Sequence, residues 1–563
     1  MELTKEQQEI LDVDLFNSDK KVLVINALAG SGKTTTLIEK VKKHPELKFC
    51  YLSFNKAIKE DVNEIINKQN ISNLSGLTMH GLAYREVLKK FGYPPIQNLN
   101  VSNVQQLLKG EYGIQVWMIY KTILLFNRYC NQVLNFNDFK DKVREMTPTE
   151  LSFLGFNDKN IHLFDNCIKY VEIVYNKMLN RQSNFITHNF YLKYFIDNLK
   201  EFNFNDFDMF LFDEAQDLNE PMAVFVKEIV NKEIPVILVG DYHQTIYGFI
   251  RSIDIMALLE KKASEIVIKK QLTNTFRFES ASKIESECNI ILGLRKEKIK
   301  GKASFTDKNI NNEAFLSRVN KSIFDKCLEL IDDGKKYDLI GGIKSFDIDT
   351  ITDIYYLIKG FYKSIKNKYI SSFSGVSNFI LSITENNDIE LMSNFLIASI
   401  CDSKGVSPEQ LFTVIEKNID YQSNIKVGTI HKTKGLGFDY VKILEYNTDE
   451  YLLGLTDSTE IEICLEGDDY KVLTLTDTNL FEEINILYVG ISRAKKQIDI
   501  SHNCYVNTLS FIKQINENKL IKLKHPSDIK NNYFKINDTY VISENTLKQW
   551  KKKAKGSRFN NTI

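Results

Sequence analysis

The sequence predicts an α/β protein with parallel sheets, and two observations support this class. An apolar run at 22–25 leads through a glycine-rich turn into a helix-like stretch at 35–40, the pattern of a strand followed by a helix. Short apolar runs followed by helical patterns also recur along the chain, which is the alternation expected of parallel sheets. The predicted strands are residues 48–54, 209–212, 235–239, 314–317, 441–445 and 497–501.

The glycine-rich turn has the composition of a phosphate-binding loop. It reads A-L-A-G-S-G-K-T from Ala27 to Thr34, with alanine where the strict pattern begins with glycine. Gly30 and Gly32 allow backbone N–H groups to approach phosphate oxygens, Lys33 supplies charge to the β- and γ-phosphates, and the Thr34 hydroxyl can bind Mg²⁺. ATP and Mg²⁺ are therefore the expected cofactors. The predicted nucleotide-binding residues of the loop are Ala27, Ala29, Gly30, Ser31, Gly32, Lys33, Thr34 and Thr35.

An acid pair follows a second apolar run. The sequence D-E-A-Q-D at 213–217 comes directly after the predicted strand 209–212, at the strand end where ligands of open α/β sheets bind. Asp213 is the predicted Mg²⁺ ligand. Glu214 is the predicted general base for the attacking water, a role that contributes about 10²- to 10⁴-fold. An acid pair at this place, in a chain with a phosphate-binding loop, predicts an ATPase.

Length and composition limit the class of protein. The chain has 563 residues, more than one hydrophobic core normally supports, so about three or four domains are expected. The apolar fraction of 43% and the charged fraction of 26% are those of an ordinary globular protein. Basic and acidic residues number 73 each, so a site for a polyanion must come from local clustering of charge.

Cysteine usage and hydropathy predict the compartment. The eight cysteines lie far apart without a C-x-x-C pair, so neither a zinc site nor a redox dithiol is expected. The first residues lack the apolar core of a signal peptide, and no run of eighteen apolar residues occurs. We expect a cytoplasmic protein with reduced thiols and no membrane contact, associated with the nucleoid if the source is bacterial.

Two stretches show helical periodicity without strand-like runs, and we interpret them as insertions into two sheet domains. Core packing accounts best for their many aromatic residues. The basic tail is expected to be a solvated extension, too short for a fused nuclease. The predicted organisation is 1–87 with 205–270 for the first sheet domain, 88–204 for its insertion, 271–346 with 423–510 for the second sheet domain, 347–422 for its insertion and 511–563 for the extension.

Further motifs occur in a fixed order. The most diagnostic is G-D-Y-H-Q-T-I-Y-G-F at 240–249, followed by L-T-N-T-F-R-F at 272–278, T-I-H-K-T-K-G-L-G-F at 429–438 and E-E-I-N-I-L-Y-V-G-I-S-R-A at 482–494. With these motifs the chain resembles superfamily 1A DNA helicases of the UvrD/Rep/PcrA type. The wording at 272–278 and 339–346 is closer to the F-box DNA helicase branch, although no F-box is evident. The resemblance implies two RecA-like domains that clamp ATP and move 3′-to-5′ on single-stranded DNA.

The resemblance also implies roles at the nucleotide. Gln7, in L-T-K-E-Q at 3–7, would read the adenine edge, and Phe276 would stack on the adenine. Gln244 would sense the γ-phosphate or the catalytic water, and Arg277 would reach the γ-phosphate. Arg493 is the expected arginine finger, a group that contributes about 10³- to 10⁵-fold in related phosphoryl-transfer sites.

DNA contacts are implied for motifs that place aromatic faces, amides and hydroxyls beside strand ends, a mixture that stacks bases and holds phosphates. Single-stranded DNA and junctions of single- and double-stranded DNA are the expected partners, and a protein loading partner is left open. The DNA-binding residues carried over are Phe54, Asn55, Lys56, Thr78, His80, Tyr247, Phe249 and His431.

Two positions depart from the family pattern. The family continues the motif at 240–249 with R-G-A, whereas this chain has Ile250, Arg251 and Ser252. Gly437 stands where the family has a glutamate that contacts the nucleotide ribose, which predicts weak recognition of the sugar.

We therefore predict an ATP-dependent DNA helicase or translocase that acts in repair, recombination or defence. The alternative is a DNA-stimulated ATPase that strips bound proteins or serves as a sensor subunit without unwinding duplexes, because the stretch 347–422 is short for the second insertion of the UvrD type. A scaffold with an inactive ATPase fits less well, since every catalytic position holds the required residue type.

Overall fold

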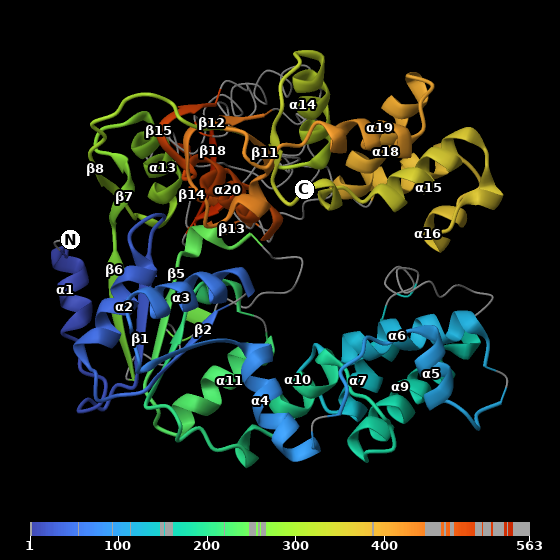
Figure 1. Ribbon diagram of the computed structural model, residues 1–563, viewed down its shortest axis with the longest axis horizontal. Helices are drawn as coiled ribbons and strands as arrows, with labels where there is room; N and C mark the ends of the chain where they lie inside the picture. The colour runs from blue at the N-terminus through green and yellow to red at the C-terminus, as the bar shows by residue number, and fades with distance from the viewer. Residues whose placement is uncertain are drawn as a thin grey trace. The chain divides into compact units, whose positions relative to one another are not determined.

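The computed structural model forms two units (Figure 1). The first comprises residues 1–26, 33–241 and 249–271, and the second comprises 27–32, 242–248 and 272–563. The residues described are 3–53, 56–92, 94–112, 114–146, 151, 161–218, 220–246, 255–256, 259, 266–385, 388–444, 463–466, 469–472, 478–500, 509, 520–521, 534–536 and 539–543. Within these ranges, no helix combines the length and the apolar character needed to cross a membrane.

A six-stranded sheet forms the centre of the first unit. Its order is β3-β2-β4-β5-β1-β6, and its first four pairings are parallel. Strands β1, β2, β4 and β5 are buried along their whole length, which is why they appear as continuous apolar runs. The expected strands 48–54, 209–212 and 235–239 are confirmed. The bounds are β1 Val22–Ala27, β2 Phe49–Ser53, β3 Leu74–Thr78, β4 Met209–Phe212, β5 Val236–Gly240 and β6 Val267–Leu272.

Five helices connect or flank these strands, namely α1 Lys5–Leu11, α2 Lys33–Lys43, α3 Lys56–Lys68, α4 Met79–Phe91 and α11 Glu220–Asn231. The caps follow from the sequence. Thr4 and Gln7 form a reciprocal capping box at the start of α1, and Thr78 caps α4, which ends at the left-handed Gly92. Buried Lys40 of α2 donates to the carbonyl oxygen of Leu11 at 3.0 Å and so holds the end of α1.

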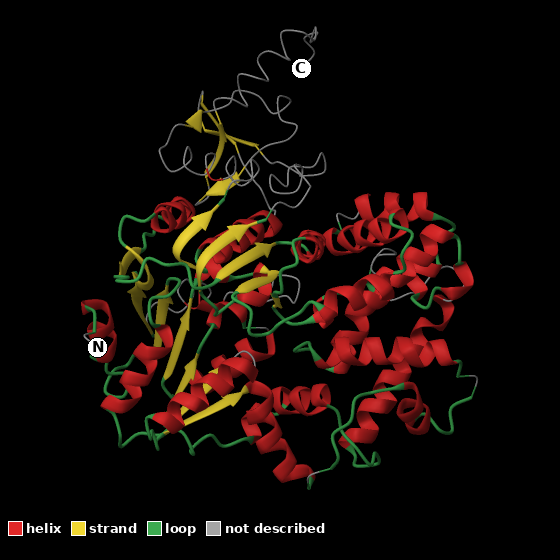
Figure 2. Cartoon of the chain, turned by 45° about the horizontal axis from the view of Figure 1, so that its top comes forward, coloured by secondary structure: helices red, strands yellow, loops and turns green. Residues whose placement is uncertain are grey.

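The stretch 88–204 is helical in its described part, as expected. Its helices are α5 Val101–Leu107, α6 Val116–Cys130, α7 Phe136–Arg144, α9 Phe164–Leu179 and α10 His188–Asp197. Figure 2 shows them as a group of helices beside the first sheet. Aromatic rings fill the space between them: Tyr129 lies 5.1 Å from Tyr175, and Tyr175 lies 5.1 Å from Phe190, centroid to centroid. Most of these aromatic side chains therefore belong to the core.

The second unit contains a five-stranded sheet in the order β10-β11-β9-β12-β15, with every pairing parallel. The bounds are β9 Glu313–Ser317, β10 Asp338–Leu339, β11 Ile425–Thr429, β12 Phe438–Ile443 and β15 Ala494–Asp499. The expected strands 314–317, 441–445 and 497–501 are confirmed, with β12 and β15 beginning three residues earlier. Helices α13 Lys283–Leu292, α14 Asn320–Asp332 and α20 Thr478–Ile491 belong to this unit, as does the parallel pair β7 Asn274–Glu279 and β8 Lys300–Ala303.

A group of antiparallel strands was not expected from the sequence. It consists of β13 Ile463–Glu466, β14 Asp469–Val472, β16 Leu520–Ile521, β17 Phe534–Ile536 and β18 Thr539–Ser543. These strands carry segments from both the predicted second sheet domain and the predicted C-terminal extension. The sequence did not predict these strands in part because each of them is short.

The stretch 347–422 is helical as expected, with α15 Ile348–Lys359, α16 Lys368–Ser371, α17 Val376–Glu385, α18 Ile389–Ser403 and α19 Pro408–Lys417. Its core is continuous with that of the neighbouring sheet. Phe412 of α19 lies 5.5 Å from Phe324 of α14 and 5.0 Å from Phe346, centroid to centroid. The predicted domain boundaries around both helical stretches remain predictions.

Candidate active site

The phosphate-binding loop lies between β1 and α2, the strand–turn–helix context that the motif requires. Gly30 and Gly32 have φ of +69° and +82°, values that favour glycine. A Cβ on Gly30 would lie 2.6 Å from the hydroxyl of Thr275 and 2.8 Å from Cβ of Arg277. The loop therefore passes too close to β7 for any side chain at position 30.

Backbone hydrogen bonds hold this loop. The N–H of Leu28 donates to the carbonyl of Leu272 at 3.0 Å, and the N–H of Phe276 donates to the carbonyl of Gly30 at 2.9 Å. Ala27 ends β1, the N–H of Ala29 donates to the hydroxyl of Tyr488 at 3.2 Å, and Ser31 is buried. Lys33, Thr34 and Thr35 form the first turn of α2, whose N–H groups are not used within the helix and suit an anion.

The acid pair lies at the carboxyl end of β4, beside the start of α2. The hydroxyl of Thr34 donates to Oδ2 of Asp213 at 3.4 Å, and the ammonium of Lys33 lies 3.2 Å from Oε1 of Glu214. Glu214 has φ of +52°, an uncommon conformation for a residue other than glycine. The structure thus brings together four of the residues that the sequence predicted for Mg²⁺ and hydrolysis.

Two residues that the sequence analysis did not select orient these carboxylates. Tyr51 of β2 is fully buried, and its hydroxyl donates to Oδ2 of Asp213. Buried Gln216 donates to Oε2 of Glu214 at 2.6 Å and accepts from the N–H of Asp241 at 3.1 Å. The position of Tyr51 within an apolar strand could have drawn attention to it. Its contact with Asp213, however, could be predicted only if β2 was known to be the neighbour of β4.

Electrostatics at Asp213 follow from this burial. Burial, and then the adjacent Glu214 charge, raises the pKa of Asp213 above its usual range, while the Lys33 charge opposes the shift. A cation bound at this carboxylate would relieve that cost. Mg²⁺ prefers oxygen ligands and binds through one or two carboxylates together with nucleotide phosphates.

The residues present fit such a shared Mg²⁺ site. The Thr34 hydroxyl and the Asp213 carboxylate supply hard oxygen ligands on adjacent elements. Among the described residues, no group of three or more His, Cys, Asp or Glu side chains could hold a metal ion by itself. The arrangement therefore suits a cation that takes its remaining ligands from a nucleotide and from water.

Gln7 is engaged within the protein. Its amide oxygen accepts from the N–H of Thr4 at 2.9 Å, and its amide nitrogen donates to the hydroxyl of Thr36 at 3.0 Å. These bonds connect the start of α1 to α2. A contact with the adenine edge remains a prediction for this side chain.

In the second unit, Gln244, Arg277 and Arg493 lie in one cluster. Arg493 is 1% exposed, and its guanidinium lies 3.4 Å from the amide oxygen of Gln244. It also donates to the carbonyl of Val489 at 3.0 Å, and Arg277 donates to the carbonyl of Ser492 at 2.8 Å. Phe276 precedes Arg277 on β7. The predicted γ-phosphate sensor and the predicted arginine finger are therefore neighbours.

Gly437 lies beside the same arginines. Its φ is not positive, so the backbone accepts other residues. A Cβ there would lie 3.6 Å from Nε of Arg277 and 3.0 Å from Cε of Lys495. A glutamate at this position would thus enter a basic environment, and the family's acidic group is missing from it.

Of the predicted DNA contacts, three have described side chains. Thr78 caps α4 through the N–H of Gly81 at 3.0 Å, and His80 is exposed on the same helix. His431 follows β11, where burial and then the charges of Arg318 and Lys434 lower its pKa to about 3. Lys56 begins α3. Phe54, Asn55, Tyr247 and Phe249 lie outside the described residues.

Comparison with known proteins is consistent with this geometry. The family model described as UvrD/REP helicase N-terminal domain matches residues 3–265, and that of the UvrD-like helicase C-terminal domain matches residues 159–505, more than half of the chain. F-box DNA helicase protein 1 of Schizosaccharomyces pombe is 25% identical over 543 residues, which cover 88% of this chain and 57% of that protein.

Two further relatives give a similar result. F-box DNA helicase 1 of Gallus gallus is 25% identical over 542 residues, covering 89% of this chain and 49% of that protein. A probable DNA helicase of Mycoplasma pneumoniae is 22% identical over 536 residues, covering 92% and 87%. The chain spans about half the length of the two F-box relatives. With its two parallel sheets, phosphate-binding loop and ordered motifs, the chain belongs to the family of UvrD-like helicases, whose two RecA-like domains these sheets represent.

Proposed function

We propose that this protein is an ATP-driven DNA helicase that moves along single-stranded DNA in the 3′-to-5′ direction. The observation that carries the proposal is the arrangement of Lys33, Thr34, Asp213 and Glu214, in which each cation or hydroxyl lies 3.2–3.4 Å from its carboxylate. Membership of the UvrD-like helicase family supports DNA as the polymer. The direction of movement rests on the resemblance alone.

The ATPase step follows from the groups in the first unit. Lys33 would exchange the Glu214 carboxylate for phosphate oxygens, which frees Glu214 to accept a proton from water. Gln216 keeps hold of the other Glu214 oxygen at 2.6 Å, so the base stays oriented. Bound Mg²⁺, held by Thr34 and Asp213, would supply charge stabilisation at the phosphates.

Positive charge for the γ-phosphate would come from two arginines. Arg277 and Arg493 are fixed by backbone carbonyls, so they are preorganised for a charge that develops on the γ-phosphate. Gln244 touches Arg493 at 3.4 Å and lies in the motif that continues to Tyr247 and Phe249. We infer that this short segment couples nucleotide state to base stacking.

The DNA contacts would come from residues that follow strands. Thr78 and His80 follow β3, and His431 follows β11. His431 would act as a neutral imidazole at physiological pH because its pKa is about 3. Such groups bind sugar and phosphate without selecting a sequence.

The experiment combines ATPase and strand-displacement assays. ATP hydrolysis is measured with and without single-stranded DNA, and unwinding is measured on duplexes with a 3′ or a 5′ tail, with Glu214→Gln as the inactive control. We expect DNA-stimulated hydrolysis and unwinding of the 3′-tailed duplex only. Stimulation without unwinding would instead support the alternative, a DNA-stimulated ATPase that strips proteins, and hydrolysis unaffected by DNA would refute both.

A further inference from the structure

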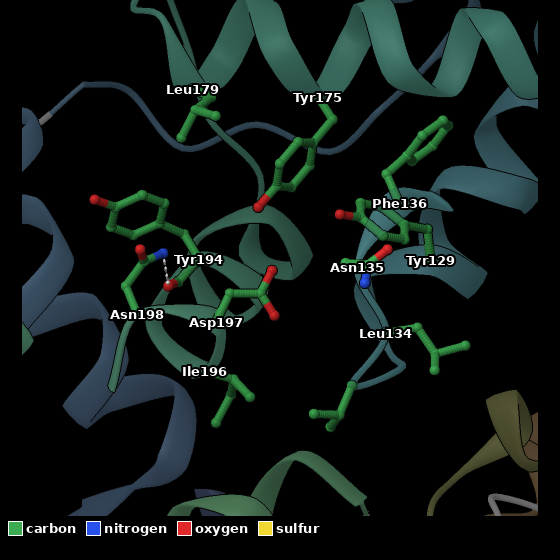
Figure 3. Close-up of a pocket in the computed structure, with 11 residues that line it drawn as sticks. Tyr129, Leu134, Asn135, Phe136, Tyr175, Leu179, Tyr194, Ile196, Asp197 and Asn198 are labelled. Carbon is green, nitrogen blue, oxygen red and sulfur yellow. Dashed lines mark hydrogen bonds between the residues drawn. The ribbon is translucent and has the colours of Figure 1, made fainter. Parts of the chain in front are cut away.

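A pocket of about 480 Å³ lies among the helices of the stretch 88–204 (Figure 3). It is formed by the end of α6, the loop into α7, the end of α9 and the end of α10. Leu134, Leu179 and Ile196 supply aliphatic walls, and four aromatic rings line the remainder. The volume is within the range of small-ligand sites, about 300–1,000 Å³.

Two phenol hydroxyls and one carboxylate point into this pocket. Tyr129 and Tyr175 are 3% and 8% exposed, and neither hydroxyl forms a hydrogen bond with a described residue. Figure 3 shows both hydroxyls and the Asp197 carboxylate directed toward the same space, whereas the Tyr194 hydroxyl points away. Neither hydroxyl is among the enclosed polar atoms that lack a partner, so both open into the pocket and are accessible to a ligand there.

The charges beside this pocket form an ion pair. Lys193, whose side chain is 1% exposed, donates to Oδ1 of Asp197 at 2.7 Å and to the carbonyl of Leu134 at 2.6 Å. Within the described part of the chain, Oδ2 of Asp197 accepts no hydrogen bond. Burial, and then the Asp197 charge, raises the pKa of both Tyr129 and Tyr175. The Lys193 ammonium lies 4.8 Å from the centroid of the Tyr129 ring.

We propose that this pocket binds an alkylammonium group, that is, a primary amine on an aliphatic chain. An ammonium has three N–H donors and no acceptor, and the pocket offers three oxygens, those of Tyr129, Tyr175 and Asp197. The aromatic walls add cation–π attraction, and the aliphatic walls accommodate the methylene chain. The amine could belong to a free polyamine or to a lysine side chain, two sources of one chemistry.

Competing ligand classes fit the pocket less well. An anion would find its nearest cation, Lys193, already bonded to Asp197 and Leu134. An alcohol of the same length has one donor for three oxygens. The proposal is independent of ATP hydrolysis and concerns residues outside the catalytic machinery.

The test measures binding of small probes to the full chain by ligand-detected NMR and calorimetry. Butylammonium and 1,4-diaminobutane are the probes, and n-butanol is the neutral control. We expect both amines to bind and butanol not to bind. Equal binding of butanol and butylammonium would overturn the proposal, as would the absence of amine binding.

Variants locate the binding. Tyr175→Phe removes one oxygen without breaking a bond to the protein, and we expect about tenfold weaker amine binding, since a hydrogen bond to a charged group is worth about 1.5–3 kcal/mol. Tyr170→Phe is the matched control, because Tyr170 is a buried tyrosine on α9 that does not line the pocket. Equal affinities in the two variants would place the amine elsewhere.

Asp197→Asn tests the charge. It should remove detectable amine binding, with the melting temperature measured in parallel because Lys193 loses its ion pair. Unchanged amine affinity in this variant would contradict the proposal. A lysine-containing tripeptide with blocked ends and its acetyl-lysine form then distinguish the sources: tighter binding of the lysine peptide than of diaminobutane identifies a protein side chain, and the reverse identifies a free polyamine.

Discussion

At the scale of single residues, Lys33 and Glu214 form an ion pair, and substitutions of the two should affect ATP hydrolysis in different ways. Glu214→Gln keeps the side-chain shape and its contact with Gln216, so ATP should still bind while turnover falls about 10²- to 10⁴-fold. Lys33→Ala removes the cation that faces the phosphates and should abolish hydrolysis. Steady-state ATPase assays and binding of a fluorescent ATP analogue check both, and near-normal hydrolysis in Lys33→Ala would show that the loop does not bind ATP.

Gly437 predicts weak selection of the sugar. The wild-type protein should use ATP and dATP with similar kcat/KM, because a ribose hydroxyl lacks its acceptor. In Gly437→Glu, a carboxylate that reaches the ribose should raise kcat/KM for ATP over that for dATP by about tenfold, because a hydrogen bond to a charged group contributes a free energy of about this size. The backbone at 437 permits the change, but Arg277 and Lys495 lie within reach of the new carboxylate.

Gly437→Gln separates these effects, since it adds the same bulk without the charge. Comparing kcat/KM for both nucleotides in the three proteins gives the answer. A strong preference of the wild type for ATP would rule out the predicted consequence of the missing glutamate.

At the scale of elements, Lys40 of α2 gives the contact with α1 a pH dependence. Burial lowers the pKa of Lys40 from 10.5 to about 8. Between these values the unfolded chain holds a proton that the folded chain has released, so this group makes stability rise with pH from about 8 to 10.5 and lowers stability below that window. The effect is about 3 kcal/mol, from a pKa difference of about 2.5.

Lys40→Met keeps the aliphatic stem and removes the titration. Denaturant unfolding of both proteins between pH 7 and 10 should show the wild type gaining stability relative to the variant as the pH rises. A difference that stays constant across this range would mean that Lys40 keeps its ordinary pKa in the folded protein.

Helix α19 should contribute to the stability of the second sheet. Phe412 is 2% exposed and packs against Phe324 and Phe346, so Phe412→Ala should cost about 3–5 kcal/mol. Hydrogen exchange should then accelerate in β11 as well as in α19. Val414→Ala on the exposed face of α19 is the control and should change stability and hydrogen exchange little. If faster exchange in Phe412→Ala were confined to residues 347–422, that stretch would be an independent domain.

In the first sheet the predicted strands β1, β2, β4 and β5 share one property, since each is a continuous buried run. Strands β3, β6, β10 and β11 were not predicted, because β3 carries Ser75 and Gly76, β6 and β11 contain lysine, and β10 has only two residues. At the site, the loop and the acid pair were evident because their motifs are contiguous. Tyr51 and Gln216 were not, because the contacts of Tyr51 with Asp213 and of Gln216 with Asp241 depend on which strands become neighbours.

At the scale of the whole molecule, DNA should regulate hydrolysis through the motif at 240–249. Tyr247→Ala should weaken the stimulation of ATPase activity by DNA more than it weakens nucleotide binding, since a lost base stack is worth about 1–3 kcal/mol. Titrations of single-stranded DNA and of an ATP analogue measure the two effects separately. Lower nucleotide affinity with unchanged DNA affinity would place Tyr247 at the nucleotide or in the core.

The interleaving of the two units along the chain limits what fragments can reveal. The chain passes between them after residues 26, 32, 241, 248 and 271, so no single cleavage separates one from the other. A fragment that ended at residue 271 would keep Lys33 and Asp213 but lose Leu272 and Phe276, whose backbone groups bond Leu28 and Gly30. Loss of activity on truncation would therefore report a collapsed loop as readily as a missing catalytic group, and point substitutions are the sounder means of assigning roles.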